Sequence, residues 1–500
     1  MQQDIFVNCN MLETRVAVIE QKKLEQYFIE RHDTKRIVGN IYKGIVESVL
    51  PGMGSSFVKL GLERNGFLYV SDVTPGGLTY DIEDVDEVAR PQQKHHKLPS
   101  IGDLLKRNDE VLVQVVKGPI GTKGPRLTTN ISMPGHFVVL MPMGGTVGIS
   151  KRIESREERD RIRKILDEIK FPKNIGLIVR TAAEGIAKRD LAREIRYLMR
   201  LWSRIRDRAR RVKAPGMAYE EYNLVLRIGR DMLTKDVSRI EIDSKDEFRH
   251  LSRFLRSFSP AFRSRVRLYS GNVPLFEKYD INRQIEKLVT RNVKLKCGGH
   301  IVIDETEGLV AIDVNSGKFV GRRNLEETVF KTNLEAAEEI ARQLRLRDLG
   351  GIIVIDFIDM EVNDHRKKVF GTLSSAIERD RAKTKILNMS SLGVVEMSRQ
   401  RMRKSLEGLI YQSCPYCSGK GLVKSASTMT IELTRRLEGF FSAPRRGRGL
   451  SIYVHPDVSD YIALPERKII HYLERRFRKR IRVIGDPKLH IEDTRIEEEQ

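Results

Sequence analysis

The chain has 500 residues, too many for a single hydrophobic core, so we expect three or four domains. With 40% hydrophobic and 32% charged residues, and no apolar run of membrane-spanning length, the composition is that of a soluble globular protein and excludes an integral membrane protein. The formal net charge of +22 indicates a polyanionic partner, either a nucleic acid or an anionic membrane surface.

The N-terminal segment, residues 5–31, has the pattern of two or three strands. It is too short to fold alone, and we expect it to pair with a later part of the chain. The first residues lack the basic start and apolar middle of a signal peptide, which favours a cytoplasmic location.

Residues 37–131 contain short alternating strands separated by Pro-Gly and Asn-Gly turns. This spacing predicts a five-stranded barrel of the OB type. Phe57 and Phe67 lie among lysines, as in barrels that stack the bases of single-stranded nucleic acid. Alternatively, these rings belong to the barrel core. Residues 74–100 have the composition of a solvated loop.

Arg180 and Thr181 are a candidate phosphate-binding pair. They follow an apolar strand, and a guanidinium beside a hydroxyl can bind a phosphate group; the alternative is an ordinary surface arginine. Residues 188–213 then form a strongly basic helix, which is either a solvated face or a track for phosphates.

The pattern of residues 309–356 predicts a strand, a helix over residues 325–346 and a second strand over residues 352–356. A helical crossover makes the two strands parallel, and their apolar runs predict burial on both faces. Asp313 and Asp356 end these strands and should lie side by side, with Asn315 nearby. Oxygen ligands of this kind favour Mg²⁺ or Mn²⁺. Alternatively, the two aspartates only cap turns.

Past this unit, residues 393–397 form another apolar strand, and Arg399, Arg401 and Arg403 are predicted to bring positive charge to the carboxylates. Cys414 and Cys417 form a CPYC turn typical of a zinc knuckle. A closed zinc site needs four ligands, so the other two would come from a second copy of the chain in a homodimer. The alternative is a reduced, metal-free turn. From residue 451 the pattern predicts a small α/β unit.

Several runs closely resemble the ribonuclease E/G family: AIDVNSGKFVG (311–321), LEETVFKTNLEAAEEIARQLRLRDLGGIIVIDFIDM (325–360), VEMSRQR (395–401) and CPYCSGKG (414–421). NIYKGIV, RNGFLYVSDV and GLIVRTA resemble the S1 barrel and the 5′-sensor region of that family. The resemblance implies a Mg²⁺-dependent endoribonuclease that cuts single-stranded RNA, such as rRNA precursors and mRNA, to 5′-phosphate and 3′-hydroxyl products. It also implies a zinc-linked homodimer that assembles as a dimer of dimers.

The resemblance assigns roles to individual residues. It implies Mg²⁺ ligands at Asp313 and Asp356 with a supporting amide at Asn315, and inter-subunit Zn²⁺ ligands at Cys414 and Cys417. The implied RNA contacts are Phe57, Phe67 and Lys123 on the S1 barrel, and the implied 5′-monophosphate pocket consists of Arg180, Thr181, Gly135 and Val139.

The implied fold class is multidomain α/β and α+β. An RNase H-like domain (residues 1–36 and 215–290) is interrupted by the S1 (OB-fold) barrel (37–130) and the 5′-sensor region (131–214), and is followed by a DNase I-like catalytic domain (291–410), a zinc link (411–425) and a small α/β dimerisation domain (426–500). The chain ends after this small domain, which resembles the G type, without the scaffold arm of E-type members. The rival hypotheses are a non-catalytic RNA-binding protein with a structural zinc and a redox protein using the two cysteines.

Overall fold

The computed structural model describes residues 2–33, 36–73, 85–87, 99–119, 123–172, 174–317, 325–378, 380, 382–401, 405–442, 449–464 and 469–499. The chain divides into two units, Met1–Leu406 and Glu407–Gln500. Within the described ranges, no helix is both long enough and apolar enough to cross a membrane. Short 3-10 helices are η1 (Pro51–Met53), η2 (Val70–Asp72), η4 (Thr181–Ala183), η5 (Pro260–Arg265) and η6 (Lys287–Val289).

The first sheet joins the N-terminus to a segment more than 200 residues later. Its strand order is β16-β15-β1-β2-β3, in which β1 and β15 are parallel and β1, β2 and β3 form antiparallel hairpins. This confirms the expected pairing of the first 31 residues with a later part of the chain. The strands are β1 (Gln3–Cys9), β2 (Glu13–Glu20), β3 (Lys23–Arg31), β15 (Val237–Ile242) and β16 (Val266–Leu268); the helices are α4 (Leu224–Asp231), α5 (Lys245–Phe258), α6 (Leu275–Lys278) and α7 (Ile281–Glu286).

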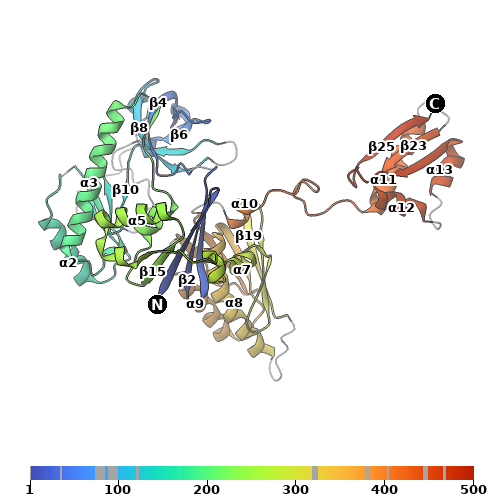
Figure 1. Ribbon diagram of the computed structural model, residues 1–500. Coiled ribbons are helices and arrows are strands. Elements are labelled where there is room, and N and C mark those ends of the chain that lie inside the picture. Colours follow the sequence, from blue (N-terminus) through green and yellow to red (C-terminus); the bar gives the residue numbers. More distant parts are fainter. Residues whose placement is uncertain are drawn as a thin grey trace. The chain divides into compact units, whose positions relative to one another are not determined.

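The second sheet closes into a barrel, as the sequence predicts. Strand β4 pairs with both β5 and β8, so that β4, β5, β6, β9 and β8 form a closed ring (Figure 1). Strand β14 adds to β4 from outside the ring. The elements are β4 (Ile41–Leu50), β5 (Ser55–Lys59), β6 (Gly66–Tyr69), α1 (Ile101–Leu104), β8 (Glu110–Lys117), β9 (Arg126–Thr128) and β14 (Gly216–Tyr219).

The third sheet has the order β10-β11-β13-β12-β7 and is covered by two helices. Its elements are β7 (Val85–Glu87), β10 (Met133–Pro134), β11 (Val138–Met141), β12 (Val147–Ser150), α2 (Arg156–Glu168), β13 (Gly176–Val179) and α3 (Lys188–Arg211). The expectation of a loop throughout residues 74–100 is wrong at β7, because these three residues pair antiparallel with β12. Residues 74–84 and 88–98 lie outside the described part of the chain.

The fourth sheet contains the predicted strand–helix–strand unit and has the order β17-β18-β19-β20-β22-β21. Its elements are β17 (Asn292–Lys294), β18 (His300–Glu305), β19 (Leu309–Asn315), α8 (Leu325–Arg347), β20 (Gly351–Asp356), α9 (Asn363–Ile377), β21 (Thr384–Ile386) and β22 (Val394–Arg399). The parallel pairing of β19 with β20 and the intervening helix confirm the prediction.

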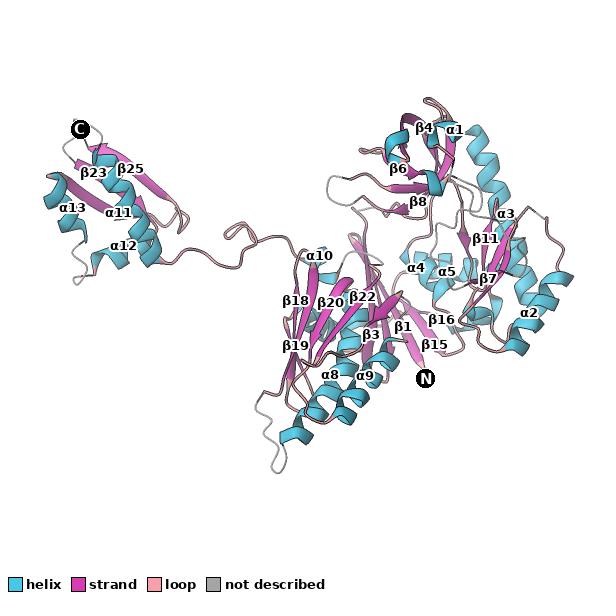
Figure 2. Cartoon of the chain, turned by 180° about the vertical axis from the view of Figure 1, so that it is seen from behind, coloured by secondary structure: helices cyan, strands magenta, loops and turns pink. Residues whose placement is uncertain are grey.

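Burial on both faces of this sheet was predicted, and that prediction is wrong. Helices α8 and α9 pack on one face of the sheet (Figure 2). Side chains of the two helices form one buried cluster with sheet residues such as Ile312 and Ile355. The other face is open, and Ile352 is 58% exposed on it. A β-branched apolar run therefore identified the strands correctly but did not reveal how many of their faces are covered.

The second unit contains a three-stranded sheet of order β24-β23-β25 with helices packed on it. Its parallel β23–β24 pair and antiparallel β23–β25 pair agree with the small α/β unit expected from residue 451. The elements after the fourth sheet are α10 (Leu406–Ile410), α11 (Ala426–Ser442), β23 (Gly449–Val454), α12 (Pro456–Ala463), α13 (Ile469–Phe477), β24 (Arg480–Gly485) and β25 (Thr494–Glu499).

Candidate functional site

Two aspartates lie side by side on the open face of the fourth sheet. Strands β19 and β20 are parallel neighbours, and their register pairs Asp313 with Asp356. Both residues are exposed. Neighbouring strands lie about 4.8 Å apart, so the two carboxylates occupy adjacent positions. The predicted adjacency of these two residues is confirmed.

The electrostatics of this pair favour a bound cation. Burial, and then the negative charges of Asp313 and Asp359, raise the pKa of Asp356 above its ordinary value. The Asn315 Nδ2 donates a 2.7 Å hydrogen bond to Asp313 Oδ2 and so orients that carboxylate. In the described ranges, no group of three or more His, Cys, Asp or Glu side chains is arranged to hold a metal. Mg²⁺ commonly uses one or two carboxylates and keeps several waters, so this donor set fits a largely hydrated divalent cation.

Helix α8 fixes the loop that follows Asp356. The buried Asn333 side chain donates to the Ile358 carbonyl at 2.8 Å and accepts from the Ile358 N–H at 3.2 Å. The Glu326 carboxylate accepts hydrogen bonds from the N–H groups of Glu361 and Val362 at 3.2 and 3.3 Å. The crossover helix therefore both makes the strands parallel and holds the end of β20 in place.

Aromatic side chains form a row on the barrel. Phe57 and Phe67 are register partners on β5 and β6, with ring centroids 5.4 Å apart, and Tyr69 lies 4.3 Å from Phe67. All three are partly exposed, whereas the intervening Val58 and Leu68 are fully buried in the barrel core. The alternative that these rings belong to the core is therefore wrong.

Two cations lie close to this aromatic row. The Arg126 guanidinium lies 5.2 Å from the centre of the Tyr69 ring. Lys123 is exposed and lies two residues before Pro125, whose carbonyl accepts a hydrogen bond from the Phe67 N–H. The structure therefore brings the backbone near Lys123 close to the aromatic row, as a nucleic-acid contact there requires.

The predicted phosphate-binding residues lie near the carboxyl end of β13 in the third sheet. Arg180 follows β13, and its Nη1 donates to the Gly135 carbonyl at 2.5 Å. Thr181 begins η4 and is exposed, while Val139 on β11 pairs with Ile178 on β13. Arg180 and Gly135 are thus in direct contact, with Thr181 and Val139 on the flanking backbone.

Gly135 is required by a buried carboxylate below it. The Glu194 Oε1 accepts hydrogen bonds from the N–H groups of Phe137 and Val138 at 2.8 and 3.0 Å. A Cβ atom on Gly135 would lie 2.2 Å from this oxygen, which leaves no room for any other residue. Glu194 therefore shapes the turn whose carbonyl contacts Arg180.

Cys414 and Cys417 lie in a tight exposed turn in the second unit. The N–H groups of Cys417 and Tyr416, and then the Cys417 thiol, lower the pKa of Cys414, and the Gly421 N–H lies 3.2 Å from Cys417 Sγ. Donors aimed at sulfur favour thiolates, the form that binds metals. The turn is followed by α11 only at Ala426, so the cysteines do not open a helix as a thioredoxin redox pair does.

Comparison with known proteins identifies the family. A model described as "Ribonuclease E/G family" matches residues 132–402, and one described as "RNase E/G, Thioredoxin-like domain" matches residues 413–499. Ribonuclease G of Salmonella typhimurium is 41% identical over 97% of this chain and 98% of its own length, and ribonuclease G of Escherichia coli is 40% identical with the same coverage.

The chain belongs to the ribonuclease E/G family. Ribonuclease E of Escherichia coli is 37% identical over 93% of this chain, which corresponds to 43% of that protein's length. The resemblance and its G-like character are thus confirmed. The thioredoxin-like match covers almost the whole second unit, and it includes the CPYC turn at its start.

One prediction about the site of this ribonuclease E/G chain is wrong. Arg399 and Arg401 were expected near the aspartates, but β22 runs antiparallel to β20. Arg399 therefore pairs with Gly351, at the opposite end of β20 from Asp356, roughly 17 Å along the strand. Arg401 donates to the Gly350 carbonyl beside it. Arg403 lies outside the described residues.

Two residues near the aspartates were missed in the sequence. Asp359 adds negative charge beside Asp356, and its position three residues after Asp356 could have been noticed. His300 on β18 pairs with Asn315 on β19 and lies on the same open face. Only the antiparallel register places this histidine there, so no local pattern could have revealed it.

The buried Glu194 predicts a measurable pH dependence of stability. Burial raises its pKa from 4.5 to about 7, and hydrogen bonds from Val138 and Phe137 lower it only in part. The folded chain thus keeps a proton that the unfolded chain loses between pH 4.5 and 7, so stability falls as pH rises through this window. A shift of this size corresponds to stability on the order of 3 kcal/mol.

Glu194→Gln should abolish this fall, because an amide oxygen still accepts the two N–H groups without a charge. Urea unfolding at pH 5 and pH 8, followed by the fluorescence of Trp202 on the same helix, measures the effect. Glu184→Gln, which changes an exposed carboxylate, is the control. Equal pH dependence of Glu194→Gln and the wild-type chain would contradict the prediction.

Proposed function

We propose that this chain is a Mg²⁺-dependent endoribonuclease that cleaves single-stranded RNA to 5′-phosphate and 3′-hydroxyl products and responds to a 5′-monophosphate. Its membership of the ribonuclease E/G family makes it an endoribonuclease, a hydrolase that acts in RNA processing. Processing of rRNA precursors and decay of mRNA are the proposed roles. The adjacency of Asp313 and Asp356 carries the proposal.

The two aspartates would hold the cation, and Asn315 would keep the Asp313 carboxylate in its orientation. A bound Mg²⁺ supplies positive charge at the scissile phosphate. In the reaction, the oxygen of a water molecule bonds to phosphorus, the bond between phosphorus and the 3′ oxygen breaks, and that oxygen leaves with a proton. The open face of the sheet gives an RNA strand access to the two carboxylates, because Asp313 and Asp356 are exposed.

The barrel would bind the RNA strand through its aromatic row. Replacing Phe57 or Phe67 by Ala removes a ring on which a base can stack, and should weaken binding by about 1–3 kcal/mol for each stacked base. Fluorescence anisotropy with a labelled single-stranded oligonucleotide, at one fixed salt concentration, measures the change. Tyr411→Ala removes an exposed ring outside the barrel and should leave the affinity unaltered. Equal effects of all three variants would contradict the proposed contact.

A 5′-phosphate pocket is proposed around Arg180, Thr181, Gly135 and Val139. A guanidinium edge can bind two phosphate oxygens at once, and the Thr181 hydroxyl can donate to a third. The contact between Arg180 and the Gly135 carbonyl supports this arrangement. RNA with a 5′-monophosphate should therefore be cut faster than the same RNA with a 5′-hydroxyl.

Cys414 and Cys417 are proposed to supply half of a tetrahedral Zn²⁺ site, completed by the same pair from a second chain. Such sharing would produce a homodimer, and pairing of two dimers would give the proposed tetramer. The expected metal content is one zinc for two chains, and strong chelation should shift the oligomer toward single chains. Mass spectrometry under native conditions, before and after chelation, tests both statements. A Cys414→Ser chain that keeps the zinc and the dimer would contradict them.

The deciding assay for the function uses one labelled single-stranded RNA with either 5′ end. Cleavage should require Mg²⁺, stop with EDTA, and leave 5′-phosphate and 3′-hydroxyl ends. The 5′-monophosphorylated form should be cut faster. Cleavage that persists in EDTA would exclude the proposed metal dependence, and binding without cleavage would favour a non-catalytic RNA-binding protein.

A further inference from the structure

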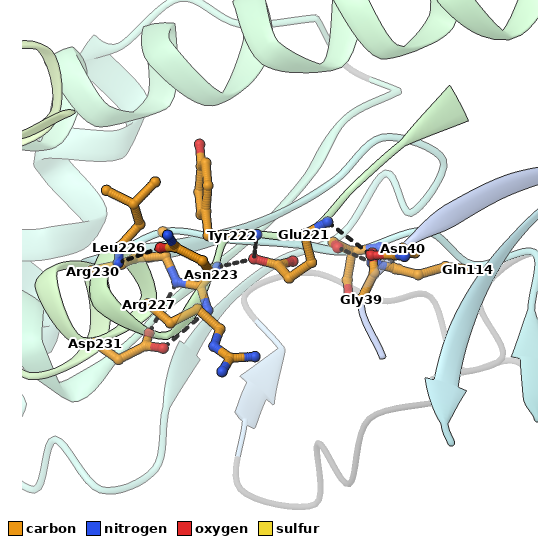
Figure 3. A network of polar contacts seen from close by, with 12 residues as sticks. Gly39, Asn40, Gln114, Glu221, Tyr222, Asn223, Leu226, Arg227, Arg230 and Asp231 are labelled. Carbon is orange, nitrogen blue, oxygen red and sulfur yellow. Dashed lines mark hydrogen bonds and ion pairs between the residues drawn. The ribbon is translucent and has the colours of Figure 1, made fainter. Parts of the chain in front are cut away.

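Arg180 belongs to a partly buried ionic network with Asp231, Arg230 and Glu221. Asp231, at the end of α4, accepts a 3.0 Å hydrogen bond from Arg180 Nη1. The same carboxylate binds Arg230 through Nε at 3.2 Å and Nη2 at 2.9 Å. Arg230 in turn donates to Glu221 at 2.8 Å, and only 7% of the Arg230 side chain is exposed (Figure 3). Two positive and two negative side chains therefore balance one another inside the first unit.

The network is fixed on several sides. The Asn40 side chain accepts a hydrogen bond from the Glu221 N–H at 2.8 Å, so the barrel holds one end of it (Figure 3). The His136 Nδ1 lies 2.7 Å from the Arg230 carbonyl, which connects the network to the turn that contains Gly135. Both groups that bind Arg180 are thus tied to the Arg230 residue.

The charges around Asp231 favour its ionised form. Its burial raises the pKa, but the charge and hydrogen bonds of Arg230, together with those of Arg180, outweigh this effect and lower it to about 2. The carboxylate therefore remains a charged acceptor, and charged hydrogen bonds of this kind are stronger than neutral ones.

The hydrogen bonds of Arg180 are all on one side of its guanidinium. The Nη1 atom binds both the Gly135 carbonyl and Asp231. Neither Nε nor Nη2 of Arg180 makes a hydrogen bond to any other residue that the structure describes. These two nitrogens share the opposite edge, which can meet two oxygens of a phosphate in a bidentate contact. With the side chain 34% exposed, this edge has access to solvent.

We propose that Asp231 is a positioning residue of the 5′-phosphate pocket, because it holds Nη1 of Arg180 and so presents the Nε–Nη2 edge to the terminal phosphate. This inference rests on the proposed response to a 5′-monophosphate. Without Asp231, the Arg180 side chain keeps its charge but regains rotamer freedom. The contact with phosphate then loses its fixed direction, although its electrostatic attraction remains.

The test compares initial rates on one RNA carrying a 5′-monophosphate or a 5′-hydroxyl. The ratio of the two rates cancels any loss of folded protein. For Asp231→Ala the ratio of the two rates should fall at least about tenfold, and for Arg180→Ala it should fall further, because that variant also removes the guanidinium. Asp231→Asn keeps the shape of the side chain and one acceptor, so its ratio should be intermediate. The change should appear in KM for the monophosphorylated RNA more than in kcat, because the interaction is made before the chemical step.

Glu221→Gln is the matched control. It alters the same network and the same Arg230 but does not touch Arg180, so its ratio should match that of the wild-type chain. Asp190→Asn removes a partly exposed ion pair with Arg193 on α3 and serves as a second control.

The outcomes distinguish a failure of the Asp231 inference from a failure of the proposed response to a 5′-monophosphate. A wild-type ratio of one, or an Arg180→Ala ratio equal to that of the wild type, refutes the proposed pocket and the inference together. If Arg180→Ala loses the preference and both Asp231 variants keep it, the pocket stands and the role of Asp231 is refuted. An equal loss in Glu221→Gln also refutes it, because the effect would then come from the network as a whole.

Discussion

Replacing Asp313 by Asn is expected to lower the rate of RNA cleavage by at least about a thousandfold, or about 4 kcal/mol of lost transition-state stabilisation. Asparagine nearly preserves the shape of the side chain but removes the charge that would hold a divalent cation beside Asp356. Asp356→Asn should have the same effect from the neighbouring strand. Initial rates on a labelled single-stranded RNA in saturating Mg²⁺ measure the loss.

Affinity for the RNA provides the companion measurement. Binding without Mg²⁺ should be the same or slightly stronger in Asp313→Asn, because a negative charge has been removed near a polyanion. Asp304→Asn is the matched control. Asp304 lies on the same face of the same sheet, but it forms an ion pair with Arg291 and is not part of the proposed cation site. A rate for Asp313→Asn within about tenfold of the wild-type rate would remove these residues from the active site.

The sequence predicted the part of the site that depends on neighbours along the chain. The apolar runs before Asp313 and Asp356 identify strands, and the helix between them dictates parallel pairing, so the adjacency followed from local patterns. Part of the barrel was predictable for the same reason, because β4, β5 and β6 follow one another with short turns, whereas residues 70–109 separate β6 from β8. Family resemblance then added proposed roles that no spacing rule supplies, such as those of Gly135 and Val139.

The rest depends on contacts between distant segments, which local patterns do not encode. Arg399 was misplaced because its strand could run in either direction, and only the antiparallel pairing sends it away from Asp356. Arg180 binds the Gly135 carbonyl and Asp231, and Glu194 shapes the turn that contains Gly135. These residues come from a turn and two helices, and none of their positions looks unusual in its own segment. Burial of a charged group is settled by the whole fold, and a pattern read along one segment cannot reveal it.

Arg399→Ala is expected to destabilise the fourth sheet by about 3–5 kcal/mol, because it removes the buried guanidinium that two buried carboxylates share. Its Nε donates to Asp380 Oδ2 at 2.7 Å, and its Nη1 donates to Asp348 Oδ1 at 3.0 Å and to the Leu349 carbonyl at 2.6 Å. Only 3% of the Arg399 side chain is exposed, and the two carboxylates are almost as deeply buried. The side chain thus joins the ends of α8 and β22 to the segment after α9.

Hydrogen exchange of the β20 and α8 amides measures this loss of stability locally, because a lower free energy of opening raises the opening equilibrium constant and with it the exchange rate. Trp202 is the only tryptophan of the chain and lies on α3, so its fluorescence reports on a different sheet.

Arg399→Lys should have an intermediate effect, because an ammonium keeps the charge but cannot bind Asp380 and Asp348 in the same forked geometry. Arg291→Ala, which breaks the exposed pair with Asp304 in the same sheet, should change little. Unaltered exchange in Arg399→Ala would contradict the prediction, and would mean that water or other side chains replace the guanidinium. Faster exchange in β20 and α8, with unaltered Trp202 fluorescence, would identify Arg399 as the residue that holds this sheet to its helices.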